Sequence, residues 1–245
     1  MSVQYNNPPL REAICELRFV LNKNLSEEEI NKFYLKIESL FPIKAKGHNL
    51  FIKSGPKDDN QDEILVEQKM EEFERFLNED TKTNVHLTSN GVVSIHKFEP
   101  YESWQKFYPV VHQIYKDFFE TFKPSSIERL GLRYVNEINL SNENFKLEDY
   151  FNYNLKFPIE NEIASQQLNL IFLTSNDNDR ISVRIAEVLQ NVKDNKKFIL
   201  DLDYFSIRIA EHDLAAIFKW IDNAHKEIEN YFESIISEKT KATFN

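Results

Sequence analysis

The clearest candidates for chemistry are charged side chains at alternating positions in two segments, 11–21 and 126–140. Each segment is predicted to be a strand, because apolar residues alternate with mostly charged ones. The charged residues in question are Glu12, Glu16, Arg18, Arg129, Arg133 and Glu137. If the two strands are neighbours, these side chains share one face of a sheet and opposite charges lie across from one another.

Two hypotheses account for this cluster. In the first, the charges form cross-strand ion pairs, each contributing about 0.2–1 kcal/mol to folding. In the second, Arg129 and Arg133 bind a phosphate or a carboxylate. Two glutamates would then orient the guanidinium groups, while Gly131 would let the ligand approach the backbone. The candidate ligand-binding residues are Arg129, Arg133, Glu12, Glu16 and Asn136.

A second candidate site is the pair Asp201 and Asp203, which are two residues apart in a predicted strand and therefore share a face. Carboxylates at this spacing can bind a divalent metal ion or perform acid–base catalysis. The alternative is a solvated strand face, or pairing of the carboxylates with Lys196 or Arg208. No nearby third carboxylate and no histidine metal motif strengthens the metal hypothesis.

Other catalytic and cofactor motifs are missing from the sequence. The four glycines do not form a P-loop or a dinucleotide-binding fingerprint. Cys15, the single cysteine, alternates with apolar residues and is predicted to be an inert core thiol. No serine stands in a Gly-x-Ser-x-Gly context. His86 and His96 could face each other on adjacent strands, but two histidines do not make a zinc site. No cofactor is therefore expected.

Composition narrows the functional classes further. The chain has 245 residues, of which 41% are hydrophobic and 13% aromatic, enough for a substantial core. Its net charge of −10 argues against a general surface for nucleic acid or anionic membranes, because both need a positive footprint. No signal-peptide pattern and no apolar run of membrane-spanning length is present, so a cytoplasmic location is expected.

The elements expected to position these residues are strands and three main helices. A capping box at Ser26 starts the first helix, an aromatic stripe from Trp104 to Phe122 marks the second, and the third covers about 212–237. Asn90-Gly91 predicts a hairpin turn. The segment 43–80 is the least certain. We favour a strand for 64–77 and a loop for 55–60.

Alternation in nearly every strand favours antiparallel pairing with one face covered. We therefore predict an α+β fold: one extended antiparallel sheet with about three main helices packed on one face. The chain is interpreted as one domain, 1–245. A division into two similar halves, 1–140 and 141–245, stays open, since each half would end in an aromatic-rich helix.

Two motifs carry a family resemblance. One is Asn7-Pro8-Pro9-Leu10-Arg11-Glu12-Ala13 followed by Glu16-Leu17-Arg18-Phe19, and the other is Arg129-Leu130-Gly131-Leu132-Arg133-Tyr134-Val135-Asn136. Together they make the chain resemble a sporadically distributed prokaryotic family of uncharacterised proteins. The resemblance implies no activity, cofactor or catalytic residue. The patchy distribution of the family is similar to that of defence or toxin–antitoxin genes.

The sequence favours a non-enzymatic protein that acts by binding another protein, or by self-association, with no nucleic-acid or membrane partner. Candidate surface aromatics for such contacts are Tyr5, Phe51, Trp104 and Trp220. One alternative is a domain that binds or hydrolyses a small phosphate or carboxylate compound at the Arg/Glu cluster. Another is a nuclease or toxin, which would need Asp201 and Asp203 to meet a further carboxylate.

Overall fold

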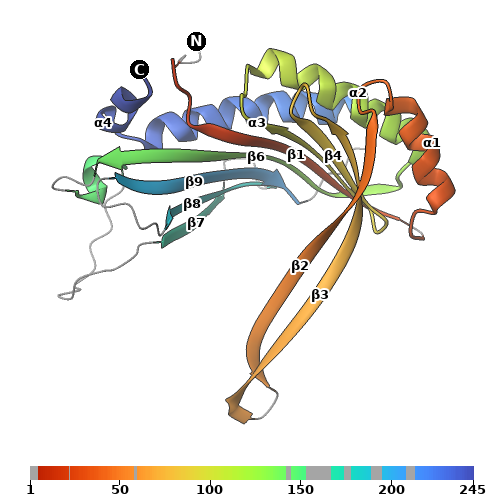
Figure 1. Ribbon diagram of the computed structural model, residues 1–245, viewed down its shortest axis with the longest axis horizontal. Coiled ribbons are helices and arrows are strands. Elements are labelled where there is room, and N and C mark those ends of the chain that lie inside the picture. The colour runs from red at the N-terminus through yellow and green to blue at the C-terminus, as the bar shows by residue number, and fades with distance from the viewer. Residues whose placement is uncertain are drawn as a thin grey trace.

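The computed structural model contains one sheet of nine antiparallel strands within the residues that it describes, in the order β2-β3-β4-β5-β1-β6-β9-β8-β7 (Figure 1). The described residues are 5–21, 23–57, 60–141, 145–152, 167–173, 178–188, 195–207 and 213–245, with the side chains of 49–69, 71 and 167–173 excluded.

The strands are β1 (Leu10–Val20), β2 (Ile43–Lys57), β3 (Asn60–Asn78), β4 (Thr83–Thr88), β5 (Val92–Phe98), β6 (Ser126–Ser141), β7 (Gln167–Leu173), β8 (Asp179–Val188) and β9 (Asn195–Ser206). The helices are α1 (Glu27–Ile37), α2 (Trp104–Phe122), α3 (Leu214–Ile235) and α4 (Glu238–Lys241), with short 3₁₀ turns η1 (Leu147–Asp149) and η2 (Ala242–Phe244).

The three long helices lie on one side of the sheet (Figure 1). Every second residue of a strand points toward these helices. In β1 the residues that do so include Ala13, Cys15 and Leu17, and all three are fully buried. Aromatic side chains fill much of the space between sheet and helices. The ring of Phe118 packs edge-on against Phe19, with ring centroids 4.6 Å apart. The predicted α+β fold, with an extended antiparallel sheet and helices on one face, is confirmed.

Helix α1 begins where the capping box predicts. The Ser26 hydroxyl accepts a hydrogen bond from the Glu29 backbone N–H, and the Glu29 carboxylate accepts one from the Ser26 backbone N–H at 2.9 Å. The apolar stripe of the helix then turns inward, with Phe33 fully buried. The Phe33 ring packs edge-on against Phe118 of α2, so the capping residue sets the position of a core aromatic.

The segment 43–80 forms a long hairpin. Strand β3 covers the whole of 64–77, so the strand expected there is confirmed. The loop expected at 55–60 is wrong at both ends, because β2 runs to Lys57 and β3 begins at Asn60, with a shift in register between Pro56 and Lys57. Residues 58–59 lie outside the described residues. The hairpin leaves the body on the side of the sheet away from the helices (Figure 1).

Strands β1 and β6 lie at the centre of the sheet and pair with each other. On its other side β1 pairs with β5, while β6 pairs with β9. The hairpin predicted at Asn90-Gly91 is also present, and Gly91 has φ +102°, a backbone conformation that favours glycine. The division of the chain into halves at residue 140 stays a prediction.

Candidate functional site

The charged cluster lies on the face of the sheet that points away from the helices, which we call the open face. Because Cys15 and Leu17 point toward the helices, their neighbour Glu16 points to the open face. In the strand register, Arg129 of β6 lies opposite Arg18 of β1, and Arg133 of β6 lies opposite Asp203 of β9. The predicted clustering of the two segments is therefore present, and β9 adds two carboxylates to it.

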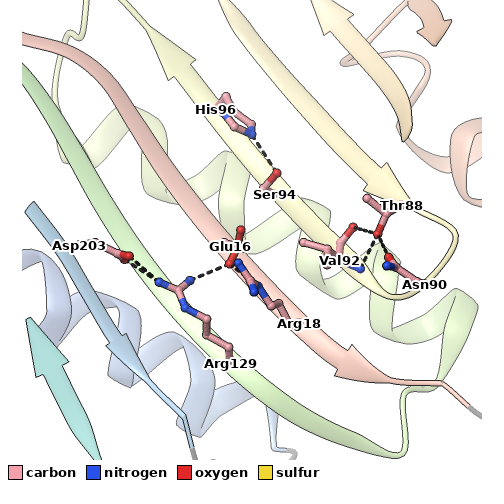
Figure 2. A network of polar contacts seen from close by, with 9 residues as sticks. All are labelled: Glu16, Arg18, Thr88, Asn90, Val92, Ser94, His96, Arg129 and Asp203. Carbon is pink, nitrogen blue, oxygen red and sulfur yellow. Dashed lines mark hydrogen bonds and ion pairs between the residues drawn. The ribbon is translucent and has the colours of Figure 1, made fainter. Parts of the chain in front are cut away.

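Arg129 lies between two carboxylates (Figure 2). Its Nη1 donates to Glu16 Oε1 at 2.7 Å, and its Nη2 donates to both Asp203 oxygens at 2.8 and 2.7 Å. The guanidinium also lies over the Phe205 ring, 4.7 Å from its centroid. With only 16% of this side chain exposed, the ion pairs are partly removed from water. These contacts fit the first hypothesis, in which the cluster is a structural set of ion pairs.

Gly131 serves Arg129 rather than a ligand. A Cβ atom at this position would lie 2.4 Å from Arg129 Nη1, closer than real contacts allow. The missing side chain therefore makes room for the guanidinium between Glu16 and Asp203. The hypothesis that Gly131 lets a ligand approach the backbone is not supported by this geometry.

Arg133 is the more accessible of the two arginines, with 43% of its side chain exposed. Its Nε and Nη2 bind both oxygens of Asp201, at 2.7 and 2.6 Å, in a two-point contact. The hydrogen bond to Asp201 raises the pKa of Arg133. Ligand binding at this residue stays a prediction.

The aspartates expected to bind a metal are therefore engaged by arginines. Asp201 and Asp203 share a face, as the spacing predicts, but their oxygens bind Arg133 and Arg129 rather than Lys196, and Arg208 lies outside the described residues. Burial raises the pKa of Asp203, and the nearby Arg129 opposes that rise. Within the described part of the chain, no group of three His, Cys, Asp or Glu side chains could hold a metal ion.

Two further candidate residues differ from expectation. Asn136 is 4% exposed and lies on the helix side of β6, where its Nδ2 donates to the Leu200 carbonyl at 3.1 Å. It therefore does not share a face with the arginines. Glu12 lies on the open face but binds His96 instead of an arginine, with 2.7 Å between Oε1 and Nδ1.

The structure adds an arrangement that the sequence analysis missed. The other ring nitrogen of His96, Nε2, is 2.8 Å from the Ser94 hydroxyl (Figure 2). Ser94, His96 and Glu12 thus form a continuous hydrogen-bonded series across β5 and β1. The available signal was the Ser-x-His spacing, because residues two apart in a strand share a face. His86 and His96 do face each other, with ring centroids 4.1 Å apart.

Most of the aromatic residues proposed for surface contacts are engaged inside the molecule. Trp104 is buried and stacks on His225, with ring centroids 4.3 Å apart. The Tyr5 hydroxyl donates to Glu233, and its ring packs on Phe244. The Phe51 side chain lies outside the described residues. Cys15 is fully buried, and burial raises the pKa of its thiol to about 12, in agreement with an inert core thiol.

A cavity of about 240 Å³ lies beside the middle of α3. Its lining comprises Asp179, Tyr204, Trp220, Asn223, Lys226 and Glu227. The buried Asp179 carboxylate accepts hydrogen bonds from the Tyr204 hydroxyl at 3.1 Å and the Trp220 Nε1 at 3.0 Å. Trp220, the fourth of the proposed surface aromatics, thus lines a cavity.

Comparison with known proteins yields little. No family model and no curated protein matches the chain. One solved structure that is similar in part is "Structure of S. pombe Pct1 RNA triphosphatase in complex with the Spt5 CTD", at 10% identity over 90% of this chain and 83% of that chain. Its TM-score of 0.21 is too low to support an argument about fold or function. None of the helices in the described residues is long and apolar enough to span a membrane.

Proposed function

We propose that the protein acts by binding another protein through the open face of its sheet. The observation that carries this proposal is the contrast between the two faces. The three long helices pack on one face, whereas the described helices leave the other uncovered (Figure 1). Half-buried aliphatic side chains nevertheless lie on that uncovered face, at Ile14, Val135 and Ile199 of the adjacent strands β1, β6 and β9.

The composition of the open face supports a protein partner. Protein interfaces are enriched in arginine and aromatic side chains, with apolar residues at the centre and polar ones around them. The open face carries arginines of this kind, at positions 18, 129, 133 and 184, together with Phe205. Apolar side chains continue to its margin, where Val188 and Ile207 are exposed.

Electrostatics also favours burial of this face by a partner. Four carboxylates of the open face, at positions 12, 16, 201 and 203, are matched in number by its arginines at 18, 129, 133 and 184, although the chain as a whole carries a net charge of −10. The main ion pairs, Arg129 with Glu16 and Asp203, and Arg133 with Asp201, are already formed. Covering charges that are already paired costs less than covering isolated ones, because each keeps its counter-charge after water is removed.

Genes of the defence and toxin–antitoxin kind are encoded together in operons, so neighbouring genes are the setting for a partner. Membership in a complex of the defence or toxin–antitoxin kind rests on the family resemblance alone. We include it in the proposal only as the setting in which a partner should be sought.

The test is a quantitative pull-down with three matched variants. Arg184→Glu and Val188→Asp change exposed residues on the open face, and Leu35→Asp changes an exposed apolar residue of α1 on the other side of the molecule. The proposal predicts one partner bound in stoichiometric amount by the wild type and the Leu35 variant, and lost from both open-face variants. The proposal is overturned if the open-face variants retain the partner. It is also overturned if light scattering shows a monomer and the pull-down recovers no bound protein.

A further inference from the structure

We propose that Ser94, His96 and Glu12 form a nucleophile, general base and orienting carboxylate for the hydrolysis of carboxylic esters. This inference goes beyond the proposed binding function and does not depend on it. It rests on the two hydrogen bonds of His96, to Ser94 at 2.8 Å and to Glu12 at 2.7 Å. A serine triad is recognised by this geometry and these roles, in whatever fold and chain order it occurs.

The contacts determine which nitrogen of His96 acts as the base. Glu12 is a carboxylate, so it accepts a hydrogen bond from the Nδ1–H of His96 and holds the imidazole in the tautomer with a free lone pair on Nε2. That lone pair faces the Ser94 hydroxyl, which can therefore donate its proton to the ring. Ser94 and His96 would be catalytic residues, and Glu12 would be a positioning residue.

An independent observation on the neighbouring strands points to a ligand. His86, directly opposite Ser94 in the pairing of β4 with β5, has a buried Nε2 without a hydrogen-bond partner among the described residues. The same is true of Nε of Arg75, which lies opposite His86 on β3. Buried polar groups are almost always paired, so two unpaired nitrogens on directly opposite residues need an explanation.

A substrate oxygen would provide the missing acceptor. Burial lowers the pKa of His86 to about 3, and His96 and Arg75 add to the effect, so the ring is neutral near pH 7. A neutral imidazole can donate an N–H to a carbonyl oxygen that becomes negative during reaction. Arg75 lies one strand further from Ser94, where it could donate to a second oxygen of the substrate.

The reaction that follows is balanced with water as the co-reactant. Ser94 Oγ bonds to the ester carbonyl carbon while its proton moves to His96 Nε2, and the carbonyl oxygen takes the electron pair beside His86. Collapse of this intermediate breaks the bond to the alcohol, which leaves with the proton from His96. Water then attacks the acyl-serine with the same base, and releases the carboxylic acid and free Ser94.

The experiment combines labelling and turnover on the full-length protein. A fluorophosphonate probe, which phosphonylates activated serines, should label the wild type at Ser94, with the peptide identified by mass spectrometry. Labelling should be lost in Ser94→Ala and His96→Gln but kept in Ser182→Ala, a control serine on the same face. Circular dichroism and urea midpoints check that each variant is folded.

Hydrolysis of p-nitrophenyl butyrate separates catalysis from structure. His86→Phe, which keeps a ring but removes the nitrogen, should lower kcat by about 10²-fold, as loss of an oxyanion donor does. Glu12→Gln should lower kcat with little change in KM, and Glu12→Asp should recover part of it. The proposal is overturned if the folded wild type is neither labelled nor active, if labelling persists in Ser94→Ala, or if His86→Phe hydrolyses the ester at the wild-type rate.

Discussion

Replacing Arg129 with methionine tests whether the charged cluster stabilises the centre of the sheet. The guanidinium joins three strands, since Arg129 lies on β6, Glu16 on β1 and Asp203 on β9. Methionine keeps the apolar stem but removes every hydrogen bond and the charge. The partly buried Asp203 would then lose both guanidinium hydrogen bonds, and Glu16 would keep only its contact with the more exposed Arg18.

The size of the effect follows from burial. Removing one member of a buried ion pair costs about 3–5 kcal/mol of unfolding free energy, because the partner charge stays buried and unpaired. Since 16% of the Arg129 side chain is exposed, we expect the lower end, about 3 kcal/mol. With a urea m-value of about 2–3 kcal/mol per M, the unfolding midpoint should fall by about 1 M.

The effect should depend on pH with a defined sign. Folding raises the pKa of Asp203, chiefly through burial, while Arg129 lowers it. A carboxyl with a raised pKa favours the folded state when protonated, and that contribution is lost as the pH rises through the folded pKa. Without Arg129 the pKa rises further. The variant should therefore lose more stability near neutral pH than at acid pH.

Arg18→Met is the matched control, because Arg18 also binds Glu16 but has 49% of its side chain exposed. Exposed pairs contribute about 0–1 kcal/mol, so its urea midpoint should fall much less. The assay is urea unfolding followed by circular dichroism at about pH 7 and about pH 4. Equal losses in the two variants, or a loss in the Arg129 variant that does not change with pH, would refute the reasoning.

Three further predictions test single features of the fold. Gly91→Ala should cost more than about 1 kcal/mol of stability, because φ is +102° and the new Cβ would lie 2.5 Å from the Phe19 carbonyl oxygen. An unchanged urea midpoint in this variant would contradict the expected strain. Ser26→Ala should cost about 1 kcal/mol through loss of the capping box, measured in the same way, and Ser26→Asp should keep most of that stability. Cys15 should not react with a thiol reagent at mildly alkaline pH in the native protein, because it is fully buried and its pKa is raised to about 12. The unfolded protein should react fully, and fast labelling of the native protein would contradict the assignment of Cys15 to the core.

Local patterns predicted much of the fold. The capping box located the start of α1, Asn90-Gly91 located a turn, and alternation identified the central strands. Helix α2 begins at Trp104, where the aromatic stripe begins, because Ser103 has extended backbone with φ −173°. The extent of β2 was missed because apolar spacing near residue 55 is weak, and pairing with β3 continues the strand regardless.

The site was predictable only in part. Sharing of a face follows from the two-residue period of a strand, so Glu16 and Arg129 were correctly grouped. Which strand lies beside β6 depends on tertiary pairing, so the binding of Arg129 and Arg133 to the aspartates of β9 could not be read from local sequence. The Ser94–His96 contact carried no such motif, because a Gly-x-Ser-x-Gly elbow places its serine on a turn, whereas Ser94 lies within a strand.

The central position of β1 affects how the chain folds during translation. Glu16 is synthesised 113 residues before its partner Arg129, and Glu12 is synthesised 84 residues before His96. At ribosomal speeds of roughly 5–20 residues per second, β1 waits roughly 6–23 s for β6. In that interval one hydrogen-bonding edge of a strand with an apolar face stays unpaired. A nascent chain stopped before residue 126 should therefore bind chaperones or aggregate, while the full-length chain completes its central pair and stays soluble.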